Sequence, residues 1–175
     1  AFLGGIAENF NSNLVLKGSE YTVAEADEFD RSFLRLSPNI ACITSMDADH
    51  LDIYGDKQHL IEGFREFAGK IKPGGSLIVR NGLDIEGETY GLEDNADYTF
   101  QNITVKNGIY HFDFHYKGGV YKDYTLLKPG RHNLLNALAA VSMAVKAGFA
   151  PEKLLPHLAT FKGVKRRFSY IIKED

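Results

Sequence analysis

The fold is decided by two short apolar runs, Ile40-Ala-Cys-Ile-Thr44 and Ser76-Leu-Ile-Val79, and by the helical pattern between them. Each run is typical of a strand that is buried on both faces of a sheet. Over residues 58–71 apolar residues recur at helical spacing, and Pro73-Gly-Gly75 ends this helix. A strand, a helix and a second strand form the unit of a parallel sheet. The sequence therefore predicts an α/β fold with a mostly parallel sheet flanked by helices.

Two short elements are expected before the first of these runs. Residues 20–26 predict a strand that leads into an acidic turn. Residues 33–36 predict a helical turn that stops before Pro38, because the residue that precedes a proline avoids helical backbone.

After the second run, polar and apolar residues alternate from Tyr98 to Leu127, with turn sequences at Asn107-Gly108 and Lys117-Gly-Gly119. This pattern predicts a small antiparallel meander of three strands, appended to the parallel sheet. Its aromatic side chains are expected to pack in a core, because they lack the Lys and Arg enrichment of a base-stacking platform.

Two helices are expected near the end of the sequence, at residues 132–147 and from Pro151 to about residue 160. The chain starts directly in an apolar segment at Ala1 and finishes on another at residues 168–172. We therefore expect it to be a piece of a longer polypeptide.

The composition suits one well-buried domain, since the chain has 175 residues of which 44% are hydrophobic. The net charge of −3 gives no general attraction to nucleic acid, and no apolar stretch is long enough for membrane insertion. Cys42 is the one cysteine and lies in the first apolar run, so we expect a reduced core residue in a cytoplasmic protein. These features favour no particular oligomeric state.

The first candidate site residue is Glu25, in the acidic run Glu25-Ala-Asp-Glu-Phe-Asp30. Such a run is often only a solvated turn. Glu25, however, is expected at the carboxyl end of a buried strand, where ligands bind in open α/β sheets and where a carboxylate needs a cation or donor beside it. Mg²⁺ suits this place, because it takes one or two protein ligands and keeps several waters.

His50 ends the segment Asp47-Ala-Asp-His50, which follows the first apolar run. It either caps a following helix or binds one metal ion together with Glu25. The second role requires that the strand before His50 and the strand before Glu25 end side by side. In the second case Asp47 or Asp49 would orient the imidazole. A zinc site is not expected, since the other histidines fall on unrelated elements.

The segment Gly130-Arg-His-Asn-Leu-Leu-Asn136 opens a predicted helix and presents Asn133 and Asn136 on one face. The two asparagines either cap the helix or help to bind a nucleotide, since a helix N-terminus attracts anions and a carboxamide can read an adenine edge. Arg167 is likewise either a surface residue or part of a phosphate clamp. The sequence contains no Gly-x-x-x-x-Gly-Lys-Ser/Thr phosphate loop, so such a nucleotide site would lack its usual cradle.

In combination these segments resemble the ATP-dependent Mur ligases, the amide-forming enzymes of peptidoglycan precursor synthesis. The matching segments occur in the order and at the approximate spacing of the family: residues 25–33, Asp49-His50, Gly130 to Asn136 and Lys165-Arg-Arg-Phe168. The resemblance implies a P-loop-ATPase-like central domain at residues 1–163, entered after its phosphate loop. It further implies that residues 164–175 form a hinge and the first strand of a C-terminal ligase domain.

The resemblance also implies an ATP-dependent ligation of L-alanine to UDP-N-acetylmuramate through an acyl phosphate. On this interpretation Glu25 and His50 hold Mg²⁺, Asn136 contacts adenine with His132 and Asn133 nearby, and Arg167 meets phosphate. The piece alone is expected to be inactive. Two alternatives stay open: a sister ligase that recycles murein tripeptide, and a nucleotide-binding regulatory domain without chemistry of its own.

Overall fold

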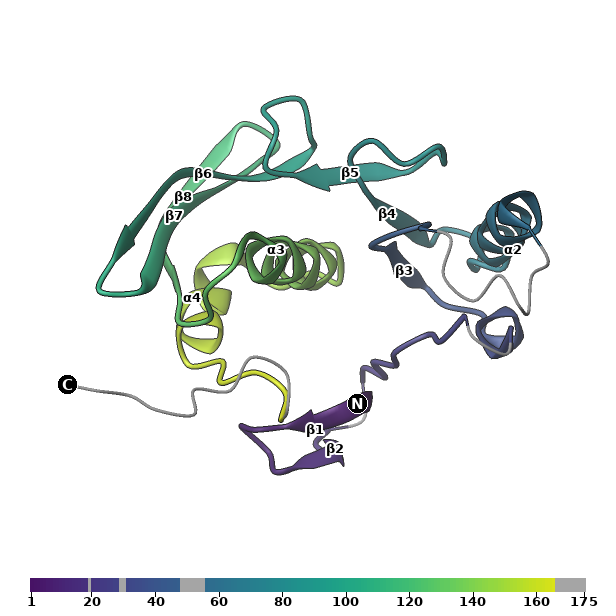
Figure 1. The fold of residues 1–175 in the computed structure, drawn as a ribbon, viewed down its shortest axis with the longest axis horizontal. Coiled ribbons are helices and arrows are strands. Elements are labelled where there is room, and N and C mark those ends of the chain that lie inside the picture. The colour runs from purple at the N-terminus through teal and green to yellow at the C-terminus, as the bar shows by residue number, and fades with distance from the viewer. Residues whose placement is uncertain (19, 29–30, 48–55, 166–175) are drawn as a thin grey trace.

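The computed structural model describes residues 1–18, 20–28, 31–47 and 56–165, and a curved six-stranded sheet is its main element (Figure 1). The strands are hydrogen-bonded to one another in chain order: β3 (Ile40–Ile43), β4 (Ser76–Arg80), β5 (Glu88–Gly91), β6 (Tyr98–Lys106), β7 (Ile109–Tyr116) and β8 (Gly119–Leu126). Strands β3 to β6 pair in parallel, and β6 to β8 pair antiparallel. The predicted α/β class is therefore confirmed, with a sheet that is mixed.

The predicted meander is confirmed, and it continues the parallel sheet directly. Strand β5, which the sequence did not predict, pairs in parallel with both β4 and β6 and joins the two halves. The two hairpin turns have positive φ at both central residues: 50° at Asn107, 74° at Gly108, 49° at Lys117 and 75° at Gly118. Such turns match the right-handed twist of the flanking strands, which explains why these short loops suffice.

Helices cover both faces of the sheet. Figure 1 shows the sheet curving around α3 (Arg131–Lys146) and α4 (Pro151–Ala159), while α2 (Lys57–Gly69) and the 3-10 turn η1 (Ser32–Arg35) lie against the opposite face at β3 and β4. Neighbouring residues of β4 accordingly point to different cores, with Ile78 packed in the α3 cluster and Val79 in the α2 cluster. The predictions for these helices, the helical turn and the two buried strands are confirmed.

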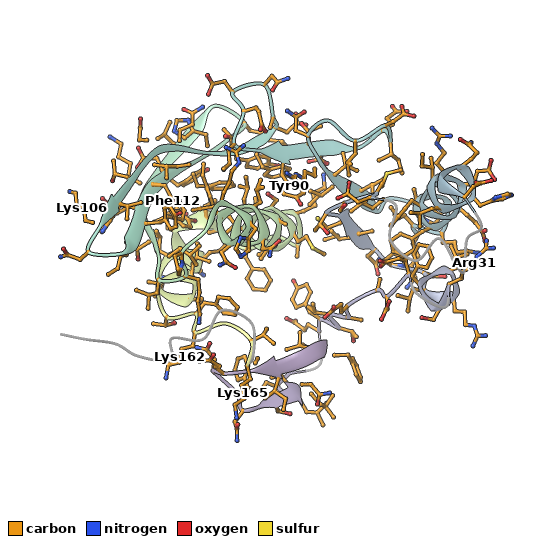
Figure 2. All side chains as sticks on the ribbon, in the orientation of Figure 1. Arg31, Tyr90, Lys106, Phe112, Lys162 and Lys165 are labelled. Carbon is orange, nitrogen blue, oxygen red and sulfur yellow. The ribbon has the colours of Figure 1, made fainter. Side chains whose placement is uncertain are left out.

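The aromatic residues of the meander pack beneath α3 and α4, as predicted. Phe100, Phe112, Phe114 and Tyr124 are at most 3% exposed and share one cluster with Leu138 of α3. Figure 2 shows Tyr90 and Phe112 on the side of the sheet that faces α3. Close ring contacts, such as 4.1 Å between the centroids of Phe100 and Phe112, add to the burial of apolar area.

Helix α3 is tied to the sheet at its C-terminal end by Lys146. Its ammonium donates to the carboxylate of Glu88 on β5, and the hydroxyl of Tyr98 donates to the same carboxylate at 2.7 Å. Burial opposes the charged form of Glu88, but the hydrogen bonds from Lys146 and Tyr98 outweigh it and lower the pKa of this carboxyl group. Glu88 therefore stays ionised and anchors α3 over the parallel half of the sheet.

The N-terminal residues form a separate antiparallel hairpin of β1 (Phe2–Ala7) and β2 (Ser12–Leu14). The predicted strand at residues 20–26 is wrong, because within the described part of the chain this segment makes only one isolated bridge, between Ala24 and Phe2. It is also largely exposed, with Tyr21 and Val23 at 55% and 54%. At the other end of β1, Ala7 forms a second isolated bridge to Val164.

Cys42 lies half-buried on β3, and burial raises the pKa of its thiol to about 12. The thiol is therefore neutral at ordinary pH, as expected of a reduced core residue. Among the described helices, none is both long and apolar enough to cross a membrane.

Replacing Phe114 with alanine should lower the free energy of unfolding by about 3–5 kcal/mol, because it removes a large side chain from a fully buried cluster. Denaturant unfolding followed by circular dichroism measures this change. The control is Val120→Ala in the same meander, whose side chain is 49% exposed and whose effect should stay within about 0.5 kcal/mol. Equal losses in the two variants would contradict the assignment of the core.

Candidate nucleotide site

The start of α3 is held in place by an unusual backbone geometry at Gly130. This residue has a φ of 101°, which side chains rarely allow, and a Cβ atom here would lie 2.6 Å from Cε1 of His132. The N–H of Gly130 donates to the hydroxyl of Tyr110 on β7 at 3.2 Å. Glycine is therefore needed both for the turn into α3 and for the position of the His132 ring.

Asn133 and Asn136 differ in their surroundings, although both lie on the first turns of α3. The side-chain amide of Asn133 donates to the carbonyl of Pro129 at 2.5 Å and so holds the preceding turn. Asn136 is exposed, and its carboxamide makes no hydrogen bond within the described part of the chain. Neither side chain caps the helix, since the N-cap is Gly130 and has no side-chain hydrogen bond. Asn136 is thus the residue of the pair that can turn its donor and acceptor to a ligand.

Two cavities flank the N-terminal half of α3, and His132 and Asn136 line both. The smaller one, of about 270 Å³, also contains Thr44, Arg80, Tyr90, Arg131 and Leu135. It lies where β3, β4 and β5 end, at the carboxyl edge of the parallel strands where ligands bind in open α/β sheets. Tyr90 lines this cavity, and burial raises the pKa of its hydroxyl, which is therefore neutral at ordinary pH.

The larger cavity, of about 640 Å³, lies between α3 and α4. Its wall is mainly apolar, and its polar lining consists of Lys128, His132, Asn133, Asn136 and His157. A volume in this range accommodates a nucleotide-sized ligand. A mainly apolar wall with a few polar groups suits a flat heteroaromatic ring attached to a polar tail.

Glu25 occupies a different place from the one predicted. It is exposed and follows the Phe2–Ala24 bridge at the edge of β1, so it does not end a buried strand. The N–H of Gly4 donates to its Oε2 at 2.7 Å, and the N–H of Glu25 donates to the carbonyl of Phe2 at 3.0 Å. Oε1 makes no hydrogen bond within the described residues. A fixed, exposed carboxylate of this kind fits a hard cation that keeps its waters.

His50 and Arg167 lie outside the described residues, so their predicted contacts with a metal ion and with phosphate stay predictions. Asp47, at the start of the segment that His50 ends, accepts a hydrogen bond of 2.5 Å from the hydroxyl of Ser45. Within the described ranges, no group of three or more His, Cys, Asp or Glu residues is arranged to hold a metal ion.

Sequence reasoning missed several residues that line the cavities, among them Thr44, Arg80 and Lys128. Thr44 and Arg80 stand at the carboxyl ends of two apolar runs, a position that would have marked them as candidates. No comparable signal exists for Lys128, because its place in the larger cavity depends on how α3 and α4 pack.

Comparison with known proteins assigns the chain to a family. A model of the Mur ligase middle domain matches residues 7–144. The chain therefore belongs to the Mur ligase family.

Among its relatives is the UDP-N-acetylmuramate–L-alanine ligase of Christiangramia forsetii, 54% identical over all 175 residues of this chain. The ligase of the same name from Flavobacterium psychrophilum is 52% identical over 99% of the chain. The chain spans 39% of the length of each of these two relatives.

One solved structure with a similar fold is MurC, the UDP-N-acetylmuramate-alanine ligase of Thermotoga maritima. It matches with a TM-score of 0.80 at 28% identity, covering 99% of this chain and 40% of that one. A MurF ligase from the same organism, solved in complex with ADP, shares the fold with a TM-score of 0.69 at 17% identity, over 86% of this chain and 37% of that one.

Replacing Gly4 with alanine should displace the Glu25 carboxylate, because the added Cβ would lie 2.7 Å from Oε2. We expect altered chemical shifts for the Glu25 carboxyl carbon and for the amide of residue 4. Gly69→Ala in α2 is the matched control, since nothing lies within 4 Å of a Cβ there. Unchanged signals at Glu25 in the Gly4 variant would show that the carboxylate is not held as described.

Proposed function

We propose that this chain is the nucleotide-binding part of an ATP-dependent ligase that joins L-alanine to UDP-N-acetylmuramate in peptidoglycan precursor synthesis. The observation that carries the proposal is the 54% identity, over the whole chain, to a relative of that name. These relatives favour this reaction over the recycling of murein tripeptide. Residues 1–163 would be the central domain and residues 164–175 the hinge and first strand of the next domain, in a cytoplasmic enzyme.

The nucleotide would bind at the N-terminal half of α3. Asn136 would pair with the adenine edge, because its exposed carboxamide offers a donor and an acceptor side by side. His132 and Asn133 line the same large cavity and would lie near the nucleotide. Arg167 would meet phosphate. A related MurF ligase has been solved with ADP, which supports nucleotide binding by this fold.

The reaction would proceed in two steps. The lactoyl carboxylate of UDP-N-acetylmuramate takes the γ-phosphoryl group of ATP and becomes an acyl phosphate. The amine of L-alanine then attacks the acyl carbon, loses a proton and expels phosphate, which leaves an amide. Mg²⁺ would neutralise phosphate charge in this chemistry, and Glu25 with His50 would hold it. Of these two residues, Glu25 lies within the described part of the chain, and the N–H of Gly4 holds its carboxylate in place.

The isolated chain should bind Mg-ATP at about millimolar strength, equivalent to about −4 kcal/mol, because its sequence contains no phosphate loop. Asn136→Ala should weaken this binding about 3- to 10-fold, the value of one hydrogen bond. Titration followed by NMR measures both constants, with the exposed Asn13→Ala on β2 as the control. We expect no ligation by the chain alone. Micromolar binding, or phosphate release with both substrates present, would contradict this account.

In the intact ligase that contains this chain, Glu25→Ala or His50→Ala should each lower kcat about 10²- to 10³-fold, since each removes a preorganised electrostatic contact. Steady-state kinetics at several Mg²⁺ concentrations would measure the loss. The matched control is Glu86→Ala, which removes an exposed carboxylate distant in sequence from the proposed site. Ordinary turnover and ordinary Mg²⁺ dependence in the Glu25 variant would refute its role.

A further inference from the structure

The large cavity between α3 and α4 has an uneven distribution of charge. Lys128 is the one lining residue with a permanent charge, and no carboxylate lines the cavity among the described residues. Of the remaining polar groups, His132, Asn133 and Asn136 lie on the first turns of α3, and His157 lies on α4. The cavity is therefore electropositive at its polar lining.

The polar and apolar parts of the lining are ordered along α3. Lys128 precedes the helix, Asn133 and Asn136 follow on the first turns, and Ala137, Ala140 and Ala144 continue the same wall. From residue 133 to residue 144 this wall extends about 16 Å at the helical rise of 1.5 Å per residue. A ligand with an anionic end and an apolar ring fits this order if its anion lies beside Lys128.

Lys128 itself is packed in a way that leaves its ammonium short of partners. Its side chain is 12% exposed, and its charged partner is Glu8, at 4.0 Å between Nζ and Oε1. That distance exceeds a charge-assisted hydrogen bond, which is about 2.7–2.9 Å. The stem lies against Gly163, where a Cβ would come within 2.6 Å of Cε. An ammonium has three donors, and no hydrogen bond from Lys128 is made within the described residues.

We propose that Lys128 is a phosphate-binding residue of the larger cavity and contacts a phosphate oxygen of the nucleotide whose base lies beside Asn136. The proposal rests on the nucleotide site proposed above and adds a contact to it. Burying a cation with one distant partner is costly, and an anionic ligand would remove that cost. The alternative is a purely structural ion pair between Lys128 and Glu8 that joins the start of α3 to the end of β1.

Titration of the chain with adenosine and with ADP, followed by NMR, separates the two roles. In the unaltered chain ADP should bind more tightly than adenosine. Lys128→Met should weaken ADP binding about tenfold or more, the value of one charged hydrogen bond, and leave adenosine binding unchanged. Lys128→Arg should restore most of the ADP affinity. Glu8→Gln, which removes the partner and keeps the lysine, should leave ADP affinity the same or higher.

Three outcomes would overturn the inference: equal weakening of adenosine and ADP in Lys128→Met, a loss of ADP affinity in Glu8→Gln as large as in Lys128→Met, or unchanged ADP affinity in Lys128→Met. If the methionine variant does not fold, the comparison of Lys128→Arg with Glu8→Gln still separates the two roles. A purely structural ion pair would be kept in Lys128→Arg and lost in Glu8→Gln, so ADP affinity would fall in Glu8→Gln only. Failure of the underlying nucleotide site would look different: neither adenosine nor ADP would shift the signals of α3 in any variant.

Discussion

The packing of α3 against the concave face of the sheet is the contact on which the rest of the structure depends. This one helix covers β3 to β6 and so spans parallel and antiparallel strands, with Leu138 fully buried at the centre. It is fixed at both ends, by the hydrogen bond from Gly130 to Tyr110 and by the pairing of Lys146 with Glu88. A helix held at two points has little freedom to rotate or slide. The side chains of its first turns are consequently presented in one arrangement.

The position of α3 also explains why two cavities exist. The helix begins at the carboxyl ends of the parallel strands and divides the space there into a polar cleft with Arg80 and a larger cavity toward α4. His132 and Asn136 lie between the two cavities and line both of them. Asn133 has a different role, because its side-chain amide donates a hydrogen bond to the carbonyl of Pro129. Two asparagines that are equivalent in the sequence pattern thus differ in the structure: Asn136 lines both cavities, and Asn133 holds the turn before the helix.

The errors of sequence reasoning have identifiable physical causes. The segment at residues 20–26 has the β-branched and aromatic residues of a strand, but a strand also needs neighbours along its length, and the structure provides one bridge at Ala24. Strand β5 was missed because Glu88-Thr-Tyr-Gly91 is too short and too polar to carry a periodic signal, and its pairing depends on β4 and β6. The meander was predicted well, since alternation and glycine-containing turns are local properties.

The sequence by itself determined most of the local elements and the family. Helical spacing, the apolar runs and the turn residues are properties of neighbouring residues, and the motif segments around Glu25 and Gly130 identify a Mur ligase without coordinates. Only the tertiary structure decided that the meander and the parallel strands form one sheet, that Gly4 fixes the Glu25 carboxylate, and that Lys128 lies in the cavity beside Asn136. These features join residues far apart in the chain, and their distances are set by how α3, α4 and β1 pack, which no local pattern encodes.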